Sequence, residues 1–142
     1  MSTIIVEADG GSRGNPGTAG GGAVVIDAAS GAIVCELGVY VGVATNNVAE
    51  YNGMIVGVQA ALERDPDAPV HVKMDSKLVV EQMTGRWKIK HPDMQVLARQ
   101  ARELIGSRRV TFEWVPRAEN ARADAVANEA MDRRESFRRD LG

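Results

Sequence analysis

The chain has 142 residues, 44% of them hydrophobic, which is enough apolar material for one buried core but not for two. Its formal net charge of −2 argues against a strongly basic protein that coats nucleic acid regardless of sequence. The single cysteine, Cys35, excludes an intramolecular disulfide, and no apolar run reaches the ~18 residues of a membrane span, so we expect one cytoplasmic domain without membrane contact.

Apolar runs in the first third of the chain predict three strands, at residues 3–8, 23–26 and 32–41. A segment rich in glycine and proline, residues 10–17, separates the first two strands, and a turn signal at residues 27–31 separates the second from the third. Because consecutive strands with short connections usually pair, these three strands are predicted to form an antiparallel meander.

After Thr45 the hydrophobic residues recur every three or four positions as far as Leu62, which predicts a helix that ends near Arg64. Breakers and changes of period then predict a strand at 70–74, a helix at 76–83, a helix that starts at Pro92 and stops at Gly106, a strand at 110–115 and a helix from about residue 120 into the 130s.

This order of elements predicts an α/β fold with a five-stranded mixed sheet, in which the first three strands are antiparallel and helices cover both faces. Trp114, in the fifth strand, is expected in the core. We assign residues 1–132 to one domain and residues 133–142 to a charged C-terminal tail or the start of a linker.

Four acidic residues are placed where they can meet. Asp9 closes the first strand and Asp75 the fourth, so their side chains emerge together at the carboxyl edge of the sheet if these strands are parallel neighbours. Glu50 is expected in the first turn of the first helix and Asp124 in an early turn of the last, and both positions can point at that edge. Clustered carboxylates without His or Cys suit Mg²⁺ or Mn²⁺, and two such ions about 4 Å apart favour phosphodiester hydrolysis.

Each acid also has a purely structural alternative. Asp9, followed by two glycines, is typical of a turn, and Glu50 stands three residues after Asn47, which is the spacing of a capping box. Asp75 is typical of a residue that caps the next helix, and Asp124 of an exposed helix face. Only the four acids together favour a metal site.

Basic residues gather in two places, and either group could face phosphate. Trp87 lies in the first group and is a candidate for stacking on a DNA strand, or alternatively an anchor for the next helix. The two groups are Arg86, Lys88, Lys90 and His91 around Trp87, and Arg133, Arg134, Arg138 and Arg139 near the C-terminus.

The segments that carry the four acids resemble the motifs of the type 1 ribonuclease H family. The similar segments are residues 9–17 (DGGSRGNPG), residues 45–51 (TNNVAEY), the pair Asp75-Ser76 and residues 119–124 (ENARAD), in the order that the family has them. The resemblance extends over residues 3–131 and implies an RNase H-like fold.

The resemblance implies an endoribonuclease that hydrolyses the RNA strand of RNA/DNA hybrids and leaves 5′-phosphate and 3′-hydroxyl ends. It implies two Mg²⁺ or Mn²⁺ ions held by Asp9, Glu50, Asp75 and Asp124 at the scissile phosphate. Short amides and hydroxyls at a groove edge can contact 2′-hydroxyls and phosphates, although helix capping is an alternative for two of them, Thr45 and Asn47. The residues expected to contact the substrate are Gly10, Gly11, Ser12, Asn15, Thr45, Asn46, Asn47, Lys77, Trp87 and Arg117.

Two departures from the long bacterial members mark this chain as a short form. Residues 85–90 (GRWKIK) stand where those members insert a basic helix, so we expect weaker and more salt-sensitive substrate binding. The loop before Asp124 also lacks the family's histidine, and Arg117 is the nearest candidate to replace it. His71 and His91 are expected to be structural.

Two other functions stay open at this stage. One is a nuclease of the same fold that acts on double-stranded RNA or a DNA junction, and the other is a module that binds hybrids without cutting them, against which the presence of all four acids argues. We expect a monomer that binds an RNA/DNA hybrid. Short family members in some bacteria are fused to a C-terminal phosphatase-like domain. The resemblance therefore raises the hypothesis that the full-length protein also has a C-terminal fused domain.

Overall fold

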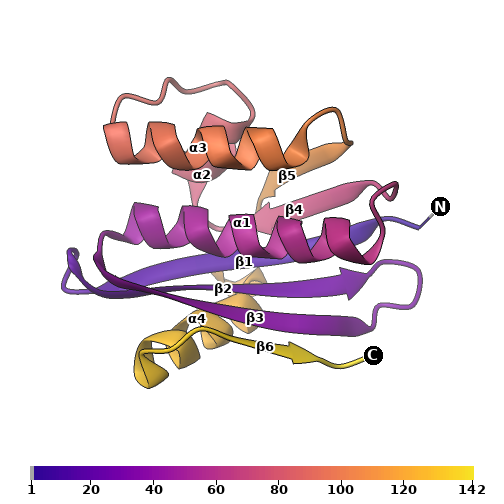
Figure 1. The fold of residues 1–142 in the computed structure, drawn as a ribbon, viewed down its shortest axis with the longest axis horizontal. Coiled ribbons are helices and arrows are strands. Elements are labelled where there is room, and N and C mark those ends of the chain that lie inside the picture. Colours follow the sequence, from indigo (N-terminus) through magenta and orange to yellow (C-terminus); the bar gives the residue numbers. More distant parts are fainter. Residues whose placement is uncertain (1) are drawn as a thin grey trace.

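Six strands and four α-helices make up residues 2–142, the part of the chain that the computed structural model describes (Figure 1). The elements are β1 (Ile4–Arg13), β2 (Gly17–Asp27), β3 (Ile33–Ala44), α1 (Asn46–Arg64), β4 (Val70–Met74), α2 (Lys77–Met83), α3 (Pro92–Ile105), β5 (Val110–Trp114), a short 3₁₀ helix (Arg117–Glu119), α4 (Ala121–Arg133) and β6 (Phe137–Asp140). None of the helices in this part of the chain combines the length and the apolar character needed to cross a bilayer.

The strands form one mixed sheet in the order β5-β4-β1-β2-β3-β6. The meander β1-β2-β3 is antiparallel, as expected, and β4 runs parallel to β1 and β5 parallel to β4. The expected number of five strands is wrong, because β6 pairs antiparallel with β3 inside the segment expected to be a tail. The sequence of β6 is FRRD, so it lacks the alternation of apolar residues by which strands are recognised.

Helices cover both faces of the sheet, as expected. In Figure 1, α1 and α3 lie in front of the sheet and α4 lies behind it. The larger core lies on the α1 side, where Val6, Met54, Val58 and Val72 are buried together, and a smaller core of Val24, Ile26 and Val126 lies under α4. The sheet is therefore buried on both faces around β1 and β2, which places the carboxyl end of β1 between α1 and α4.

Trp114 is not a core residue, which corrects the sequence-based expectation. Its side chain is 48% exposed, because β5 is an edge strand and Trp114 stands at its end. The indole N–H donates a hydrogen bond to the backbone oxygen of Asp75 at 3.1 Å. Trp114 thus flanks the segment that connects β4 to α2.

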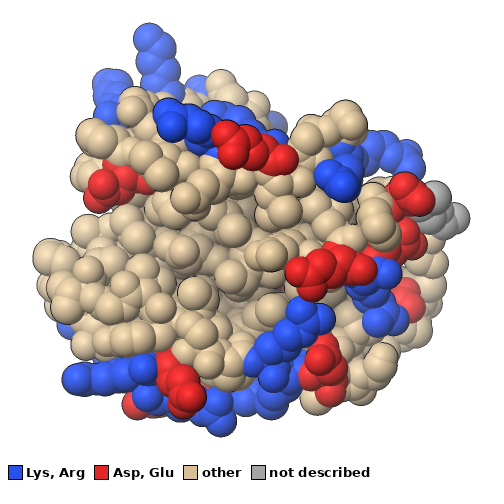
Figure 2. Space-filling view, viewed as in Figure 1, with Lys and Arg blue, Asp and Glu red and all other residues tan. Residues whose placement is uncertain are grey.

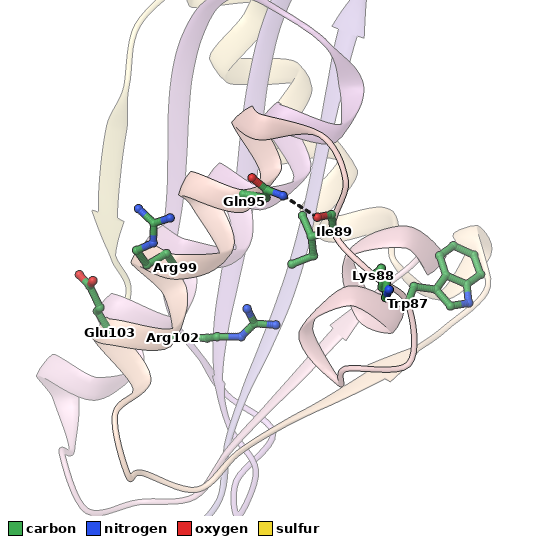
Figure 3. Close-up of a pocket in the computed structure, with 7 residues that line it drawn as sticks. All are labelled: Trp87, Lys88, Ile89, Gln95, Arg99, Arg102 and Glu103. Atoms are coloured by element: carbon green, nitrogen blue, oxygen red, sulfur yellow. Dashed lines mark hydrogen bonds between the residues drawn. The ribbon is translucent and has the colours of Figure 1, made fainter.

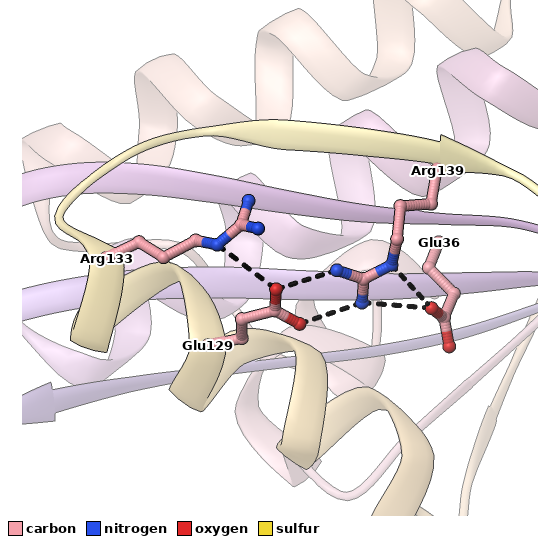
Figure 4. Close-up of polar contacts among 4 residues, drawn as sticks. All are labelled: Glu36, Glu129, Arg133 and Arg139. Atoms are coloured by element: carbon pink, nitrogen blue, oxygen red, sulfur yellow. Dashed lines mark hydrogen bonds and ion pairs between the residues drawn. The ribbon is translucent and has the colours of Figure 1, made fainter.

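The last strand is held against the sheet by charged and aromatic contacts (Figure 4). The Arg139 guanidinium lies between Glu36 of β3 and Glu129 of α4, with nitrogen to oxygen distances of 3.0 and 2.7 Å. Arg133 also pairs with Glu129, and the guanidiniums of Arg133 and Arg139 each lie 4.6 Å from the centre of the Phe137 ring. Arg138 likewise pairs with Glu63 and Asp140. Three of the four arginines of the C-terminal basic group are therefore engaged with carboxylates rather than open to phosphate.

Replacing Phe137 by Ala should lower the free energy of unfolding by about 2 kcal/mol, because the ring packs against the smaller core and its loss leaves a cavity under α4. Urea unfolding followed by circular dichroism measures the change. Leu141→Ala is the matched control, since Leu141 is 53% exposed beyond the end of β6 and should cost little. Unfolding of Phe137→Ala at the wild-type urea concentration would show that the Phe137 ring adds nothing to the stability of the domain.

Candidate active site

Two of the four acids follow directly after the parallel pairing of β1 with β4. Ala8 of β1 pairs with Met74 of β4, so the next residues, Asp9 and Asp75, lie side by side at the carboxyl edge of the sheet. Asp9 is buried, with 7% of its surface exposed. Because β1 continues to Arg13, Asp9 lies within a strand and is not the turn residue that the alternative supposed.

The other two acids come from helices on opposite faces of the sheet. Glu50 is the fifth residue of α1, just beyond its first turn, and the helix is capped by Thr45, whose hydroxyl accepts the Val48 N–H at 3.4 Å. A capping box built on Asn47 and Glu50 is therefore wrong. Asp124 lies in the first turn of α4 and is half-buried rather than exposed.

All four acids line one cavity of about 440 Å³ between β1, α1 and α4. Ser76, not Asp75, caps α2, because its hydroxyl accepts the Val79 N–H at 3.3 Å. The structural alternatives for Asp9, Glu50, Asp75 and Asp124 thus fail individually, and the predicted meeting of the four acids is present in the fold.

Burial and neighbouring charge raise the pKa of two of the carboxylates in this cavity, Asp9 and Glu50. Burial raises the pKa of Asp9 well above its ordinary value, and the charges of Asp75 and Asp124 raise it further. Burial also raises the pKa of Glu50 to about 7, with a hydrogen bond from Ser76 lowering it and the charge of Asp75 raising it. A bound cation would relieve this repulsion, because it stabilises the ionised form of every carboxylate around it.

The donor set of the cavity fits Mg²⁺ or Mn²⁺. Within residues 2–142, no three His, Cys, Asp or Glu side chains surround a single point closely enough to enclose an ion. Mg²⁺ does not need such an enclosure, since it keeps several waters and is usually bound by one or two carboxylates together with substrate phosphates. The four oxygen donors, without sulfur or imidazole, exclude a structural zinc site here.

Asn120 is a site residue that no sequence signal had singled out. Its amide nitrogen donates to Asp75 Oδ1 and to the Ala8 carbonyl, both at 2.9 Å, and the residue is 1% exposed. Its Oδ1 is the one buried side-chain oxygen or nitrogen between residues 2 and 142 without a hydrogen-bond partner. Asn120 therefore fixes the orientation of Asp75 from the start of α4.

The structure brings part of the expected substrate-binding set into the acid cavity. Six of these residues line it: Gly10, Gly11, Ser12, Asn46, Asn47 and Arg117. Ser12 and Asn46 are also tied together, because the Ser12 N–H donates to Asn46 Oδ1 at 2.7 Å. The cavity has further walls from α4 that sequence reasoning did not identify, among them Asn128, and Arg13 lies at its rim.

Four expected contact residues lie outside the cavity. Asn15 accepts the Asn46 N–H at 3.0 Å and so contacts a residue of the cavity wall. Thr45 caps α1, and Lys77 is exposed at the start of α2. Trp87 is 45% exposed on the loop between α2 and α3, so it does not anchor α3 in the core.

Trp87 lines a second hollow of about 590 Å³, which the loop shares with α3 (Figure 3). Arg99 and Arg102 come from α3 and join Lys88 there, so the basic group around Trp87 is larger than the sequence indicated. Figure 2 shows Lys and Arg side chains along the α3 side of the molecule, whereas the middle of this face is largely uncharged. Trp87 and the acids thus occupy two separate depressions.

Comparison with known proteins adds to this geometry. A sequence model of a family described as "Reverse transcriptase-like" matches residues 7–130, a range that includes all four acids. The bifunctional protein Rv2228c of Mycobacterium tuberculosis is 55% identical over 130 residues, which are 91% of this chain and 35% of that protein. Ribonuclease HI of Halobacterium salinarum is 46% identical over 125 residues, which are 87% of this chain and 62% of that protein.

Solved structures agree with this match. The N-terminal RNase H domain of Rv2228c has a TM-score of 0.88 at 53% identity, covering 94% of this chain and 96% of that chain. LC11-RNase H1, solved in complex with an RNA/DNA hybrid, has a TM-score of 0.87 at 39% identity, covering 92% of this chain and 98% of that one. The chain therefore spans about a third of the full bifunctional relative but nearly all of its solved N-terminal domain.

Proposed function

The chain belongs to the ribonuclease H family, and from this premise we propose that it is an endonuclease that cuts the RNA strand of RNA/DNA hybrids. The observation that carries the proposal is the cavity in which four carboxylates meet, from β1, α1, α4 and the segment after β4. A fold maintained only for binding has no need of buried carboxylates that raise one another's pKa. The hybrid bound to LC11-RNase H1 supports the choice of substrate.

The proposed mechanism assigns Asp9, Glu50, Asp75 and Asp124 as ligands of two Mg²⁺ or Mn²⁺ ions. Such ions, when bound, lower the pKa of a water and neutralise negative charge at a phosphate. The chain itself orients the ligands: Asn120 holds one oxygen of Asp75, and Ser76 donates to Glu50. Products with 5′-phosphate and 3′-hydroxyl ends are proposed on the family resemblance.

Selection of RNA would come from polar groups beside the acids. Asn46 uses its Oδ1 on the Ser12 N–H, and its amide N–H₂ keeps its hydrogens for a substrate oxygen. The Ser12 hydroxyl donates to the Ala44 carbonyl at 2.6 Å, which leaves its lone pairs as acceptors. A donor and an acceptor side by side suit a 2′-hydroxyl, which DNA lacks.

The test is cleavage of a hybrid labelled on each strand in turn, with Mg²⁺, Mn²⁺ or EDTA. We expect metal-dependent loss of the RNA strand alone, and no cleavage of double-stranded DNA. Equal cleavage of double-stranded RNA would favour a nuclease of the same fold with another substrate. Tight hybrid binding without cleavage would favour a binding module.

Three narrower expectations stay predictions. A monomer is testable by light scattering and a cytoplasmic location by cell fractionation. A further C-terminal domain in the natural protein is proposed because Rv2228c is described as bifunctional and this chain matches 35% of it. A transcript that extends past the codon for Gly142 would support that proposal.

A further inference from the structure

Arg13 stands on the same side of β1 as the acid Asp9. Alternate residues of this strand face α4: Glu7 pairs with Arg122 of α4 at 2.7 Å, and Arg13 pairs with Asp132 of α4, also at 2.7 Å. Asp9 and Arg13 are four positions apart on an extended strand, which is about 13 Å. Arg13 therefore lines the same cavity as the acids but at its far rim.

The cavity has more acidic than basic side chains, so the position of each basic side chain bears on how a nucleic acid can bind there. Its lining has four carboxylates and two cationic side chains, Arg13 and Arg117. A polyanionic strand approaching such a surface is repelled unless its phosphates meet positive charge on either side of the acids. Arg117 lies in the 3₁₀ helix just before α4, whereas Arg13 pairs with Asp132 near the other end of α4. Arg13 is therefore the cation at the opposite end of the cavity.

Contacts with α4 hold the Arg13 guanidinium in place but do not occupy all of its N–H donors. Its Nη2 donates to Asn128 Oδ1 at 3.3 Å and lies 3.5 Å from the Asn128 carbonyl, and its Nη1 pairs with Asp132. An arginine carries five N–H donors, so others remain for a ligand. Asn128 in turn donates to the Asp124 carbonyl at 3.0 Å, which connects Arg13 to the helix turn that carries an acid.

We propose that Arg13 binds a phosphate of the RNA strand next to the one addressed by the four acids, and that Asp132 competes with this phosphate for the guanidinium. The inference rests on the proposed function, because it assumes that the RNA strand lies along the cavity. Planar two-point contacts make arginine well suited to a phosphate. Asn128 positions the side chain and Asp132 limits the affinity, so loss of Arg13 and loss of Asp132 act in opposite directions.

The first experiment measures KM, kcat and salt dependence on an RNA/DNA hybrid. Arg13→Ala should raise KM about fivefold to tenfold with kcat unchanged within about twofold, and reduce the slope of log affinity against log salt by about 1. Asp132→Asn should lower KM about twofold. Arg64→Ala is the matched control for charge, since Arg64 ends α1, about 20 Å along the helix from Glu50. It should change neither KM nor the salt slope.

The second experiment removes the charge from the substrate instead of the protein. In a strand with a short ribonucleotide block, which fixes the cut, single phosphates are replaced by neutral methylphosphonates. At one position within a few nucleotides of the cut, the methylphosphonate should raise KM for the wild type and for Arg64→Ala. The KM of Arg13→Ala, already raised, should not increase further with the same substrate. Circular dichroism confirms that each variant is folded.

An Arg13→Ala variant with wild-type KM and salt slope, or with an additive loss at every methylphosphonate, would overturn the inference while wild-type cleavage still supports the proposed function. Failure of the wild type to cut any hybrid would overturn the proposed function instead. Arg13 is then judged by hybrid binding in Ca²⁺, where equal affinity of wild type and Arg13→Ala would reject the phosphate contact. Misfolding of Arg13→Ala would leave Asp132→Asn and the neutral phosphates to decide.

Discussion

Replacing Asp9 by Asn is expected to abolish cleavage of the RNA strand, by at least about a thousandfold in rate, while hybrid binding stays measurable in Ca²⁺. The amide keeps the shape of the carboxylate but has no charge for a divalent cation. Asp9 is central to the acid cluster, since both Asp75 and Asp124 lie close enough to raise its pKa. Single-turnover cleavage in Mg²⁺ measures the rate.

The same variant should be more stable than the wild type at pH 8. Burial and the charges of Asp75 and Asp124 raise the pKa of Asp9 from 3.8 to about 8 in the folded protein. Between these two pH values the folded state binds more protons than the unfolded chain, so the protein loses stability as the pH rises. For Glu50 the interval runs from the ordinary value of 4.5 to about 7. Asn carries no charge at any pH, so its gain at pH 8 is on the order of 1 kcal/mol. Thermal unfolding at pH 5 and pH 8 measures it.

Addition of Mg²⁺ tests whether Asp9 is a metal ligand. The wild type should gain thermal stability from Mg²⁺ at pH 8 and little at pH 5, whereas Asp9→Asn should respond weakly at both. Asp67→Asn is the control, because Asp67 is exposed on the loop after α1 and should leave cleavage and stability unchanged. An Asp9→Asn enzyme that still cuts would remove Asp9 from the metal site.

Regular hydrophobic periods made much of this fold predictable. The period of three to four residues placed α1 and α3, and the short apolar run of β4 was found with its bounds. The meander was found too, but its strands are longer than expected, since β1 and β2 run deep into the glycine-rich segment. Glycine weakens a strand by its local propensity, and here close packing of α1 and α4 on the sheet overrides that preference.

The acids of the site were predictable because each stands in a motif at the end of an element. Asn120 and Arg13 were not singled out, because their roles depend on contacts with residues far away in the sequence, Asp75 and Asp132 respectively. Trp87 lies in a hollow apart from the acids, so its expected stacking on the DNA strand stays a prediction. Local sequence therefore identified the charged centre of the site and not the residues that orient it.

Replacing Gly10 by Ala should lower both the stability of the domain and the rate of cleavage. A Cβ at Gly10 would overlap the backbone of Ala49 and Glu50 in α1, and a backbone cannot turn aside as a side chain can. The same close contact between α1 and β1 is seen from the helix, because a Cβ at Gly53 of α1 would overlap the backbone carbonyl of Asp9 in β1. We expect a loss of about 3 kcal/mol in the free energy of unfolding. In the folded fraction, displacement of Glu50 should lower kcat about a hundredfold.

Gly11→Ala is the matched neighbour for the stability measurement. Its Cβ would meet only the flexible end of Met131, at 3.3 Å, so unfolding in urea should shift by less than about 1 kcal/mol. A Gly10→Ala protein as stable as Gly11→Ala would show that α1 has room to move away from β1. If that stable protein also kept the wild-type rate, the position of Glu50 would not depend on this contact, and the seating of α1 on β1 would not be what brings the carboxylates together.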